Sequence, residues 1–334
     1  MGSDSGLIIA RAPLRIPLGG GGTDLPSYYS RFGGAWCSAA IDKYVWVTVN
    51  KPKADDAIRV YYKRHEDCRT VDEVQHDLVK AALRHLDIDG GVQITSIGDV
   101  PDGTGLGSSG SYCVALLAAL REFAGARVPV HHLAAEACYV EMEMARHPVG
   151  KQDQYIAAFG GLQAFATDTH GKVRVTPILA RPMTVDALEQ RMQLWYTGIT
   201  RSSKEFLTEQ ARATTDEDAQ MIEGLHLVRS LGLEIRDALE QGNLNRVGKA
   251  MHEHWMSKRQ RQGGITSSEI DEHYAAAREA GTIGGKLVGA GGGGFLLLLC
   301  ADGSEDAVRS AMKLCQLREM PFQFDFEGVR TWRV

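Results

Sequence analysis

The stretch "PDGTGLGSSGSYCVALLAAL", residues 101–120, has four glycines and three serines between positions 103 and 111 and then becomes apolar. Apolar residues continue at helical spacing as far as Gly125, which predicts a helix over 111–125. Bare backbone directly before a helix fits a flexible loop, a tight turn or a cradle for phosphate. A helix N-terminus favours the last of these, because it presents unpaired N–H groups and a partial positive charge.

The common nucleotide-binding motifs do not explain this loop. No Gly-Lys pair of the chain is followed by Ser or Thr, which excludes a Walker loop. The spacing G-x-G-x-x-G occurs at 105–110 and again at 289–294. The first copy follows a Pro-Asp break and has no acid at the expected distance, while the second precedes a strand and opens no helix. A dinucleotide fold is therefore not predicted. What remains is an anion-binding loop or, alternatively, a serine-capped helix after a turn.

Composition excludes several classes of protein. The 334 residues are 44% hydrophobic and 24% charged, with a net charge of −5, which is typical of a globular protein of about two domains. Acidic and basic residues are interspersed, so the sequence predicts no binding to nucleic acid and none to membranes. Six scattered cysteines without metal-ligand spacing indicate free thiols. With no signal peptide recognisable, we expect a cytoplasmic protein.

Strands and helices are predicted to mix without regular alternation, which favours an α+β fold. We expect one domain over residues 1–170 and a second over 171–334. The predicted strands are 44–49, 57–62, 91–97, 193–198, 295–300 and 322–333, with two more around 162–178. The predicted helices are 71–86, 111–125, 131–147, 203–213, 217–241, 243–260, 268–280 and 304–318.

Three motifs in order resemble those of the GHMP small-molecule kinases. "PDGTGLGSSGS" (101–111) is similar to their phosphate loop and departs only in Gly110, where alanine is usual. "RAPLRIPLGGGGTDLPSYYSRFGG" (11–34) and "GGKLVGAGGGGFLLLL" (284–299) resemble the N-terminal and C-terminal motifs. The resemblance spans almost the whole chain. It implies a ribosomal-protein-S5-domain-2-like N-terminal domain and a ferredoxin-like C-terminal domain, with the site between them.

The resemblance also implies the residues that serve ATP. Asp153, read as lying in a loop, is expected to be the general base, and Arg15 to keep it ionised and to stabilise developing charge. Ser109 and Glu141 are expected to hold Mg²⁺, although Glu143 on the same helix is the alternative. The expected ATP-binding residues are Gly103, Gly105, Leu106, Gly107, Ser108, Ser109, Gly110 and Ser111.

The acceptor side resembles one branch of the family. Galactokinases carry Gly-Glu-His before Thr-Asp, whereas this chain has Gly20-Gly21-Gly22 before Thr23 and Asp24, which leaves more room beside the sugar. Asp24 is expected to bind a sugar hydroxyl. Together with "VGKQDQYIAAFGG" and "TGITRSSKEFL", residues 20–24 resemble the branch that phosphorylates D-glycero-D-manno-heptose 7-phosphate at its anomeric hydroxyl. An octose 8-phosphate and free fucose are the alternative substrates. A non-catalytic sugar sensor is the alternative outside enzymes.

A substrate that already carries a phosphate needs a second anion site. Residues 200–204, which follow a glycine turn and open a predicted helix, combine hydroxyls with two cations. A solvated, capped helix end is the equally open alternative. His252 and His254 diverge on a predicted helix, so a shared metal is not expected, and either one is a weaker candidate to line the sugar pocket. The expected substrate-binding residues are Gly22, Thr23, Asp24, Lys151, Arg201, Ser202, Ser203, Lys204, Gly291 and Gly292.

Overall fold

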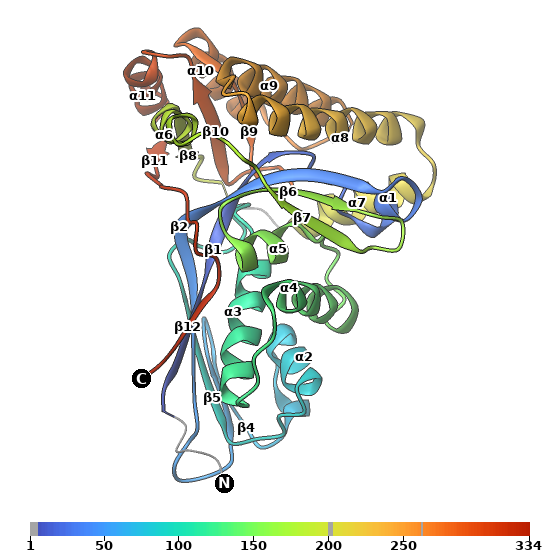
Figure 1. Cartoon of the computed structure of the whole chain (residues 1–334), viewed down its shortest axis with the longest axis vertical. Helices are drawn as coiled ribbons and strands as arrows, with labels where there is room; N and C mark the ends of the chain where they lie inside the picture. The colour runs from blue at the N-terminus through green and yellow to red at the C-terminus, as the bar shows by residue number, and fades with distance from the viewer. Residues whose placement is uncertain (1–5, 200–202, 262) are drawn as a thin grey trace.

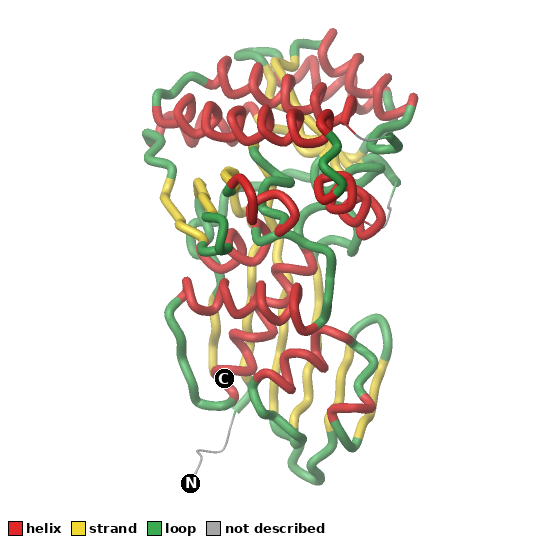
Figure 2. The backbone as a smooth tube through the Cα atoms, turned by 90° about the vertical axis from the view of Figure 1, so that its right-hand side faces the viewer, coloured by secondary structure: helices red, strands yellow, loops and turns green. Residues whose placement is uncertain are grey.

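The computed structural model describes residues 6–199, 203–261 and 263–334. In this part of the chain two sheets have helices packed against them (Figures 1 and 2). The strands are β1 (Ile8–Gly19), β2 (Gly34–Asn50), β3 (Ile58–Tyr61), β4 (His65–Cys68), β5 (Val92–Gly98), β6 (Leu162–Thr167), β7 (Val173–Pro177), β8 (Met192–Tyr196), β9 (Thr282–Leu287), β10 (Phe295–Cys300), β11 (Arg318–Glu319) and β12 (Arg330–Arg333). The helices are α1 (Pro26–Phe32), α2 (Asp77–His85), α3 (Ser108–Phe123), α4 (Val130–Cys138), α5 (Gln152–Phe159), α6 (Pro182–Arg191), α7 (Ser203–Thr215), α8 (Ala219–Glu240), α9 (Leu244–Arg261), α10 (Ser268–Glu279) and α11 (Glu305–Leu314).

The first sheet is built on the long strand β2. Its order is β12-β1-β2-β5-β3-β4, and β6 pairs with the first half of β2 and carries β7. All pairs are antiparallel except β3 with β5. Strand β1 shifts register at Pro13 and again at Pro17, because proline has no N–H to donate to a ladder. These two irregularities lie on either side of Arg15 in strand β1.

Helix α3 is the central helix of the half of the molecule that contains the first sheet (Figure 1). Every residue from Gly110 to Leu120 is buried, so the helix is apolar on all sides and packs against β1, β2, α4 and α5. Helices α2, α3 and α4 gather on one face of the long strands (Figure 1). Because α3 is held on all sides, the loop that precedes it has a fixed position relative to the sheet.

The second sheet has the order β11-β8-β10-β9, and all six residues of β10 are buried. Helix α9 packs on β9 at a point where both carry glycine. A Cβ added to Gly284 would lie 1.8 Å from the carbonyl oxygen of Gly248 and 3.0 Å from the amide nitrogen of His252. Glycine at this position therefore lets the helix lie directly on the strand. Helices α8 and α9 lie side by side above it (Figure 1).

Most of the predicted elements are found, and four need correction. The predicted helix 71–86 begins only at Asp77, after a short 3₁₀ turn at Val71–Glu73. The predicted helix 304–318 ends at Leu314, and the predicted helix 131–147 becomes a π-helical turn after Cys138. The predicted final strand 322–333 is reduced to β12, because residues 320–329 form no regular element apart from one isolated bridge between Phe324 and Ile41. Both β7 and β12 belong to the first sheet. The division at residue 170 stays a prediction.

No helix in the described ranges is long and apolar enough to cross a membrane.

The close approach of α9 to β9 gives a stability prediction. Gly284→Ala should lower the free energy of unfolding by about 1–3 kcal/mol, because the added methyl group overlaps helix backbone that has no room to move. Chemical denaturation of both proteins measures the difference. Gly263→Ala is the matched control, since nothing lies within 4 Å of its added Cβ. Equal stability of the two variants would contradict the proposed steric limit.

Candidate active site

A cavity of about 600 Å³ lies between the two sheets and takes its walls from both. This size is typical of sites for small molecules and cofactors. The glycine-rich loop before α3, the start of α5 and residues Gly21 and Gly22 line one side. Helix α9, strand β9 and the turn after it line the other. The predicted motifs from three distant parts of the sequence therefore meet at one cavity.

The loop before α3 has the geometry of an anion cradle. Gly103, Gly105 and Gly107 have φ angles of +75°, +85° and +81°, a region that non-glycine residues rarely adopt. The loop reaches the N-terminus of α3 at Ser108, and five of the predicted ATP-binding residues line the cavity: Gly103, Gly105, Gly107, Ser108 and Ser109. The other three do not line it. Leu106 is fully buried, Gly110 faces α5, and Ser111 donates to the carbonyl oxygen of Pro13 at 2.8 Å.

The second glycine cluster lies against this loop. A Cβ on Gly289 would lie 2.5 Å from the Cα of Gly105, and one on Gly294 would lie 2.2 Å from the carbonyl oxygen of Thr104. Of the two predicted substrate residues here, Gly291 lines the cavity and Gly292 is not among the lining residues. The turn after β9 thus supports the loop before α3 through direct backbone contact.

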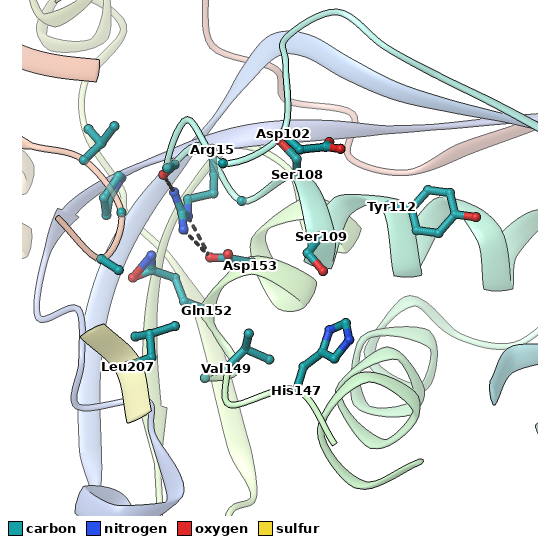
Figure 3. A pocket seen from close by; sticks show the side chains of 18 of the residues that line it. Arg15, Asp102, Ser108, Ser109, Tyr112, His147, Val149, Gln152, Asp153 and Leu207 are labelled. Atoms are coloured by element: carbon teal, nitrogen blue, oxygen red, sulfur yellow. Dashed lines mark hydrogen bonds and ion pairs between the residues drawn. The ribbon is translucent and has the colours of Figure 1, made fainter. Parts of the chain in front are cut away.

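Arg15 and Asp153 form an ion pair in the wall of the cavity (Figure 3). The guanidinium Nε donates to Asp153 Oδ1 at 2.7 Å, Nη2 lies 2.6 Å from the same oxygen, and Nη1 donates to the carbonyl of Gly105 at 2.5 Å. Burial raises the pKa of Asp153, and the charge of Arg15 opposes that rise. The predicted loop position of Asp153 is wrong, because this residue is the second of helix α5.

Gly110 explains how α5 can lie so close to α3. A Cβ at this position would lie 2.6 Å from the Cβ of Asp153 and 3.0 Å from the amide nitrogen of Gln154. The absence of a side chain at Gly110 therefore sets the distance between Asp153 and the N-terminus of α3. This is the one position at which the phosphate-loop motif departs from the usual alanine.

Glu141 lies on the π-helical turn Tyr139–Met144, where the wider helix changes which side chains face inward. Its carboxylate is fully buried and accepts from Ser109 Oγ at 2.5 Å and from Gln154 Nε2 at 2.7 Å. His147 lies 3.6 Å away, and its hydrogen bonds to Asp77 and Glu141 raise the pKa of His147 to about 9. The alternative Glu143 is exposed and is not among the lining residues.

The predicted acceptor-side residues divide into two groups. Asp24 and Gly22 line the cavity, and the Asp24 carboxylate accepts from the amides of Gly22 at 2.9 Å and Gln152 at 3.1 Å. Thr23 is fully buried and donates to the carbonyl oxygen of Gly20, so its hydroxyl supports the turn. Lys151 is not among the lining residues, because its Nζ donates to the carbonyl of Gly171 at 2.5 Å.

The predicted second anion site at residues 200–204 falls mostly on residues that the structure does not describe. Arg201 and Ser202 lie outside the described residues. Helix α7 begins at Ser203, and Lys204, the second residue of this helix, is not among the described residues that line the cavity. Sequence reasoning missed several polar residues that do line it: Tyr62, Lys63, His76, Asp77, Ser96, Asp102, Tyr112, His147, Gln152, Gln154, Gln210, Lys258, Arg261 and Lys286.

Comparison with known proteins agrees with this geometry. The chain matches the GHMP kinases N terminal domain over residues 76–161 and the GHMP kinases C terminal domain over 235–315. The chain therefore belongs to the GHMP kinase family, and kinases of this family use ATP as the phosphate donor. The predicted two-domain α+β fold is confirmed.

Three similar proteins extend this assignment. D-glycero-alpha-D-manno-heptose 7-phosphate kinase of Campylobacter jejuni is 26% identical over 98% of this chain and 99% of its own. L-fucokinase/L-fucose-1-P guanylyltransferase of Bacteroides fragilis is 24% identical over 89% of this chain and 35% of its own. A crystal structure described as a D-glycero-D-manno-heptose 1-phosphate kinase from "Bacteriodes thetaiotaomicron" has a TM-score of 0.80, with 24% identity over 98% of this chain and 99% of its own.

The contact between Gly110 and α5 gives a kinetic prediction. Gly110→Ala should lower kcat by about 10- to 100-fold, because the methyl group displaces Asp153 from its place beside the loop. Binding of an ATP analogue should change little, since Gly110 does not line the cavity. Steady-state kinetics and calorimetric titration of the analogue measure the two effects. An unchanged kcat would show that α5 adjusts without moving its carboxylate.

Proposed function

We propose that the protein transfers the γ-phosphoryl group of ATP to the anomeric hydroxyl of a sugar phosphate, with D-glycero-D-manno-heptose 7-phosphate as the substrate and the 1,7-bisphosphate as the product. The observation that carries the reaction is the Arg15–Asp153 pair, which lies in one cavity with a glycine-rich loop at a helix N-terminus. The choice of sugar is supported by the heptose 7-phosphate kinase that matches this chain over 98% of its length.

The donor phosphates are assigned to the loop before α3. Gly103, Gly105 and Gly107 line the cavity and carry no side chains that would keep a phosphate from the backbone, and the hydroxyls of Ser108 and Ser109 add donors. The N-terminus of α3 contributes partial positive charge to the same place. Transfer of a phosphoryl group depends mainly on positioning and electrostatic stabilisation, which a preformed loop of this kind supplies.

Asp153 is the proposed base for the acceptor hydroxyl. An anomeric hydroxyl is more acidic than an ordinary alcohol, so a single carboxylate suffices to orient it and accept its proton. Arg15 Nε donates a hydrogen bond to Oδ1, and Nη2 forms an ion pair with the same oxygen, which leaves Oδ2 without a hydrogen bond from Arg15. The same guanidinium favours the ionised carboxylate and stabilises negative charge that develops beside it.

Glu141 and Ser109 are the residues proposed to hold Mg²⁺. Their side chains already meet at 2.5 Å, and a buried carboxylate beside a hydroxyl matches the oxygen ligands that this ion prefers. In the described residues no three His, Cys, Asp or Glu side chains cluster as metal ligands. That agrees with the usual Mg²⁺ site of kinases, in which one or two protein ligands act together with substrate phosphates. When bound, the ion would neutralise charge on the phosphates.

Asp24 is the residue proposed to bind sugar hydroxyls. It is 7% exposed, and the amides of Gly22 and Gln152 hold its carboxylate in one orientation. A carboxylate can accept further hydrogen bonds beyond these two, and its cavity-facing side is available to the hydroxyls of a sugar. The side chains of Gln152 and Gln210 line the cavity near it and add amide donors and acceptors.

The alternative substrates keep the reaction and change the sugar. An octose 8-phosphate would use the same groups, and free fucose would need no distal phosphate site. The fucokinase relative favours fucose as the second candidate. A sugar sensor without activity is disfavoured by the intact Arg15–Asp153 pair.

A substrate panel tests the proposal. With Mg·ATP, ADP should be released with heptose 7-phosphate and at most slowly with fucose, galactose, mannose or mevalonate, because only the first places a phosphate at the far end of the cavity. A coupled ADP assay measures this, and phosphorus NMR of the product should show a new anomeric phosphate. Turnover of fucose alone would overturn the choice of sugar. Absence of ADP release with every sugar would favour the non-catalytic sensor.

The ion pair gives a prediction for pH dependence. Asp153→Asn should lower kcat by about 10²–10⁴-fold and leave binding of ATP nearly unchanged. Arg15→Met should move the acid limb of the kcat profile to higher pH, because loss of the guanidinium raises the pKa of Asp153 further above its usual value. Activity then disappears earlier as pH falls. Profiles measured between about pH 5 and 9 decide this, and an unmoved acid limb would rule out Asp153 as the titrating base.

A further inference from the structure

Four basic side chains on the C-terminal side of the cavity have no role in the mechanism above. His254, Lys258 and Arg261 come from α9, and Lys286 comes from β9; we call these four the basic cluster. All four line the cavity. Among the described residues after position 203, the cavity lining includes these basic groups and no carboxylate. One wall of the cavity is therefore positively charged.

The charges of the basic cluster are not neutralised within the described chain. Lys258 Nζ donates to the carbonyl of Gly289 at 2.6 Å, and Lys286 Nζ donates to the carbonyl of Leu18 at 3.2 Å. Arg261 Nε and Nη1 are buried without any hydrogen-bond partner. No described carboxylate forms an ion pair with any of the three. Each ammonium has three donors, so capacity remains for a ligand.

His254 is a second and independent sign of a ligand. It is 3% exposed, and neither of its ring nitrogens has a hydrogen-bond partner. Buried polar atoms are almost always hydrogen bonded, so an imidazole with two unsatisfied nitrogens in a cavity wall needs an explanation. Burial, followed by the charges of Lys286, Arg261 and Lys258, lowers the pKa of His254. The neutral ring still offers one N–H donor toward the cavity.

Burial of uncompensated cations is costly, and the pKa values reflect this. Burial lowers the pKa of Lys286 to about 7 and that of Arg261 to about 10, and it also lowers the pKa of Lys258. A bound dianion would offset the free-energy cost of burying these positive charges. Asp153, a carboxylate in the same cavity, is already paired with Arg15 and does not supply the missing counter-charge.

We propose that the basic cluster binds the phosphate monoester that the sugar substrate already carries. This inference rests on the proposed function for the identity of the ligand. Two features place the subsite on the acceptor side. Lys286 donates a hydrogen bond to the carbonyl oxygen of Leu18, which directly precedes the Gly19–Gly22 segment of the acceptor side. The phosphates of ATP are already assigned to the loop before α3. The basic cluster is a different distal phosphate site from residues 200–204, whose role stays a prediction.

The γ-phosphate of ATP is the competing source of a phosphate at the basic cluster, because Lys258 is bonded to Gly289, which touches Gly105 of the loop. A binding experiment without turnover separates the two. Inorganic phosphate is titrated calorimetrically into the full chain saturated with Mg²⁺ and the β,γ-imido analogue of ATP. Lys258→Met and Arg261→Met should each weaken phosphate binding by about tenfold or more, while Lys249→Met, an exposed lysine of the same helix, should not.

The kinetic experiment identifies the phosphate. For both cluster variants KM for heptose 7-phosphate should rise by about tenfold or more, with KM for ATP changed less than about twofold. For the heptose without its phosphate, the variants and the wild type should have equal kcat/KM. A parallel rise in KM for ATP would assign the basic cluster to the γ-phosphate and overturn the proposal, as would unchanged constants for both substrates.

The two experiments also separate this inference from the proposed function. If phosphate binds through Lys258 but no sugar phosphate is turned over, the proposed function fails and the anion subsite stands. If heptose 7-phosphate is turned over by the wild type and by both variants with equal constants, the function stands and the subsite is wrong. Circular dichroism and thermal melting of each variant check that the chain is folded.

Discussion

The active cavity depends on direct backbone contact between two glycine-rich segments that are about 180 residues apart in the sequence. Gly105 and Gly289 touch at distances that no side chain would permit, and so do Thr104 and Gly294. The first segment follows β5 of the sheet that carries Arg15, and the second connects β9 and β10 of the sheet that carries Lys286. Their contact fixes the two halves against each other, so the donor loop and the acceptor wall keep one spacing.

The local sequence pattern was sufficient to predict structure where the functional residues and the element that holds them lie in one short stretch. The loop and helix at 101–123 could be predicted because glycine, serine and helical periodicity each point to the same feature. Asp153 was harder to place. Its flanking glycine and proline favour a loop, but a short helix packed under Gly110 begins one residue earlier. The π-helical turn at Glu141 has no sequence signature, because it depends on tertiary contacts that favour a wider turn.

The basic cluster shows what spacing alone leaves undecided. His254, Lys258 and Arg261 are four and three residues apart, so they share one face of α9. That signal was present in the sequence, but charged residues on a helix usually face solvent. Only the packing of α8 beside α9, and of α9 on the glycines of β9, turns this face toward the cavity. Lys286 joins them from a strand whose apolar neighbours predict burial and nothing more.

Strand β12 pairs with the first residues of β1, from Ile8 with Arg333 to Arg11 with Arg330, so the two ends of the described chain lie together in one sheet (Figure 1). During synthesis on the ribosome, β1 emerges more than 300 residues before its outer partner. The edge of β1 at Ile8–Arg11 therefore stays without this partner until residues 330–333 have been made. Such long-range pairing makes folding slow and exposes an open strand edge in the nascent chain.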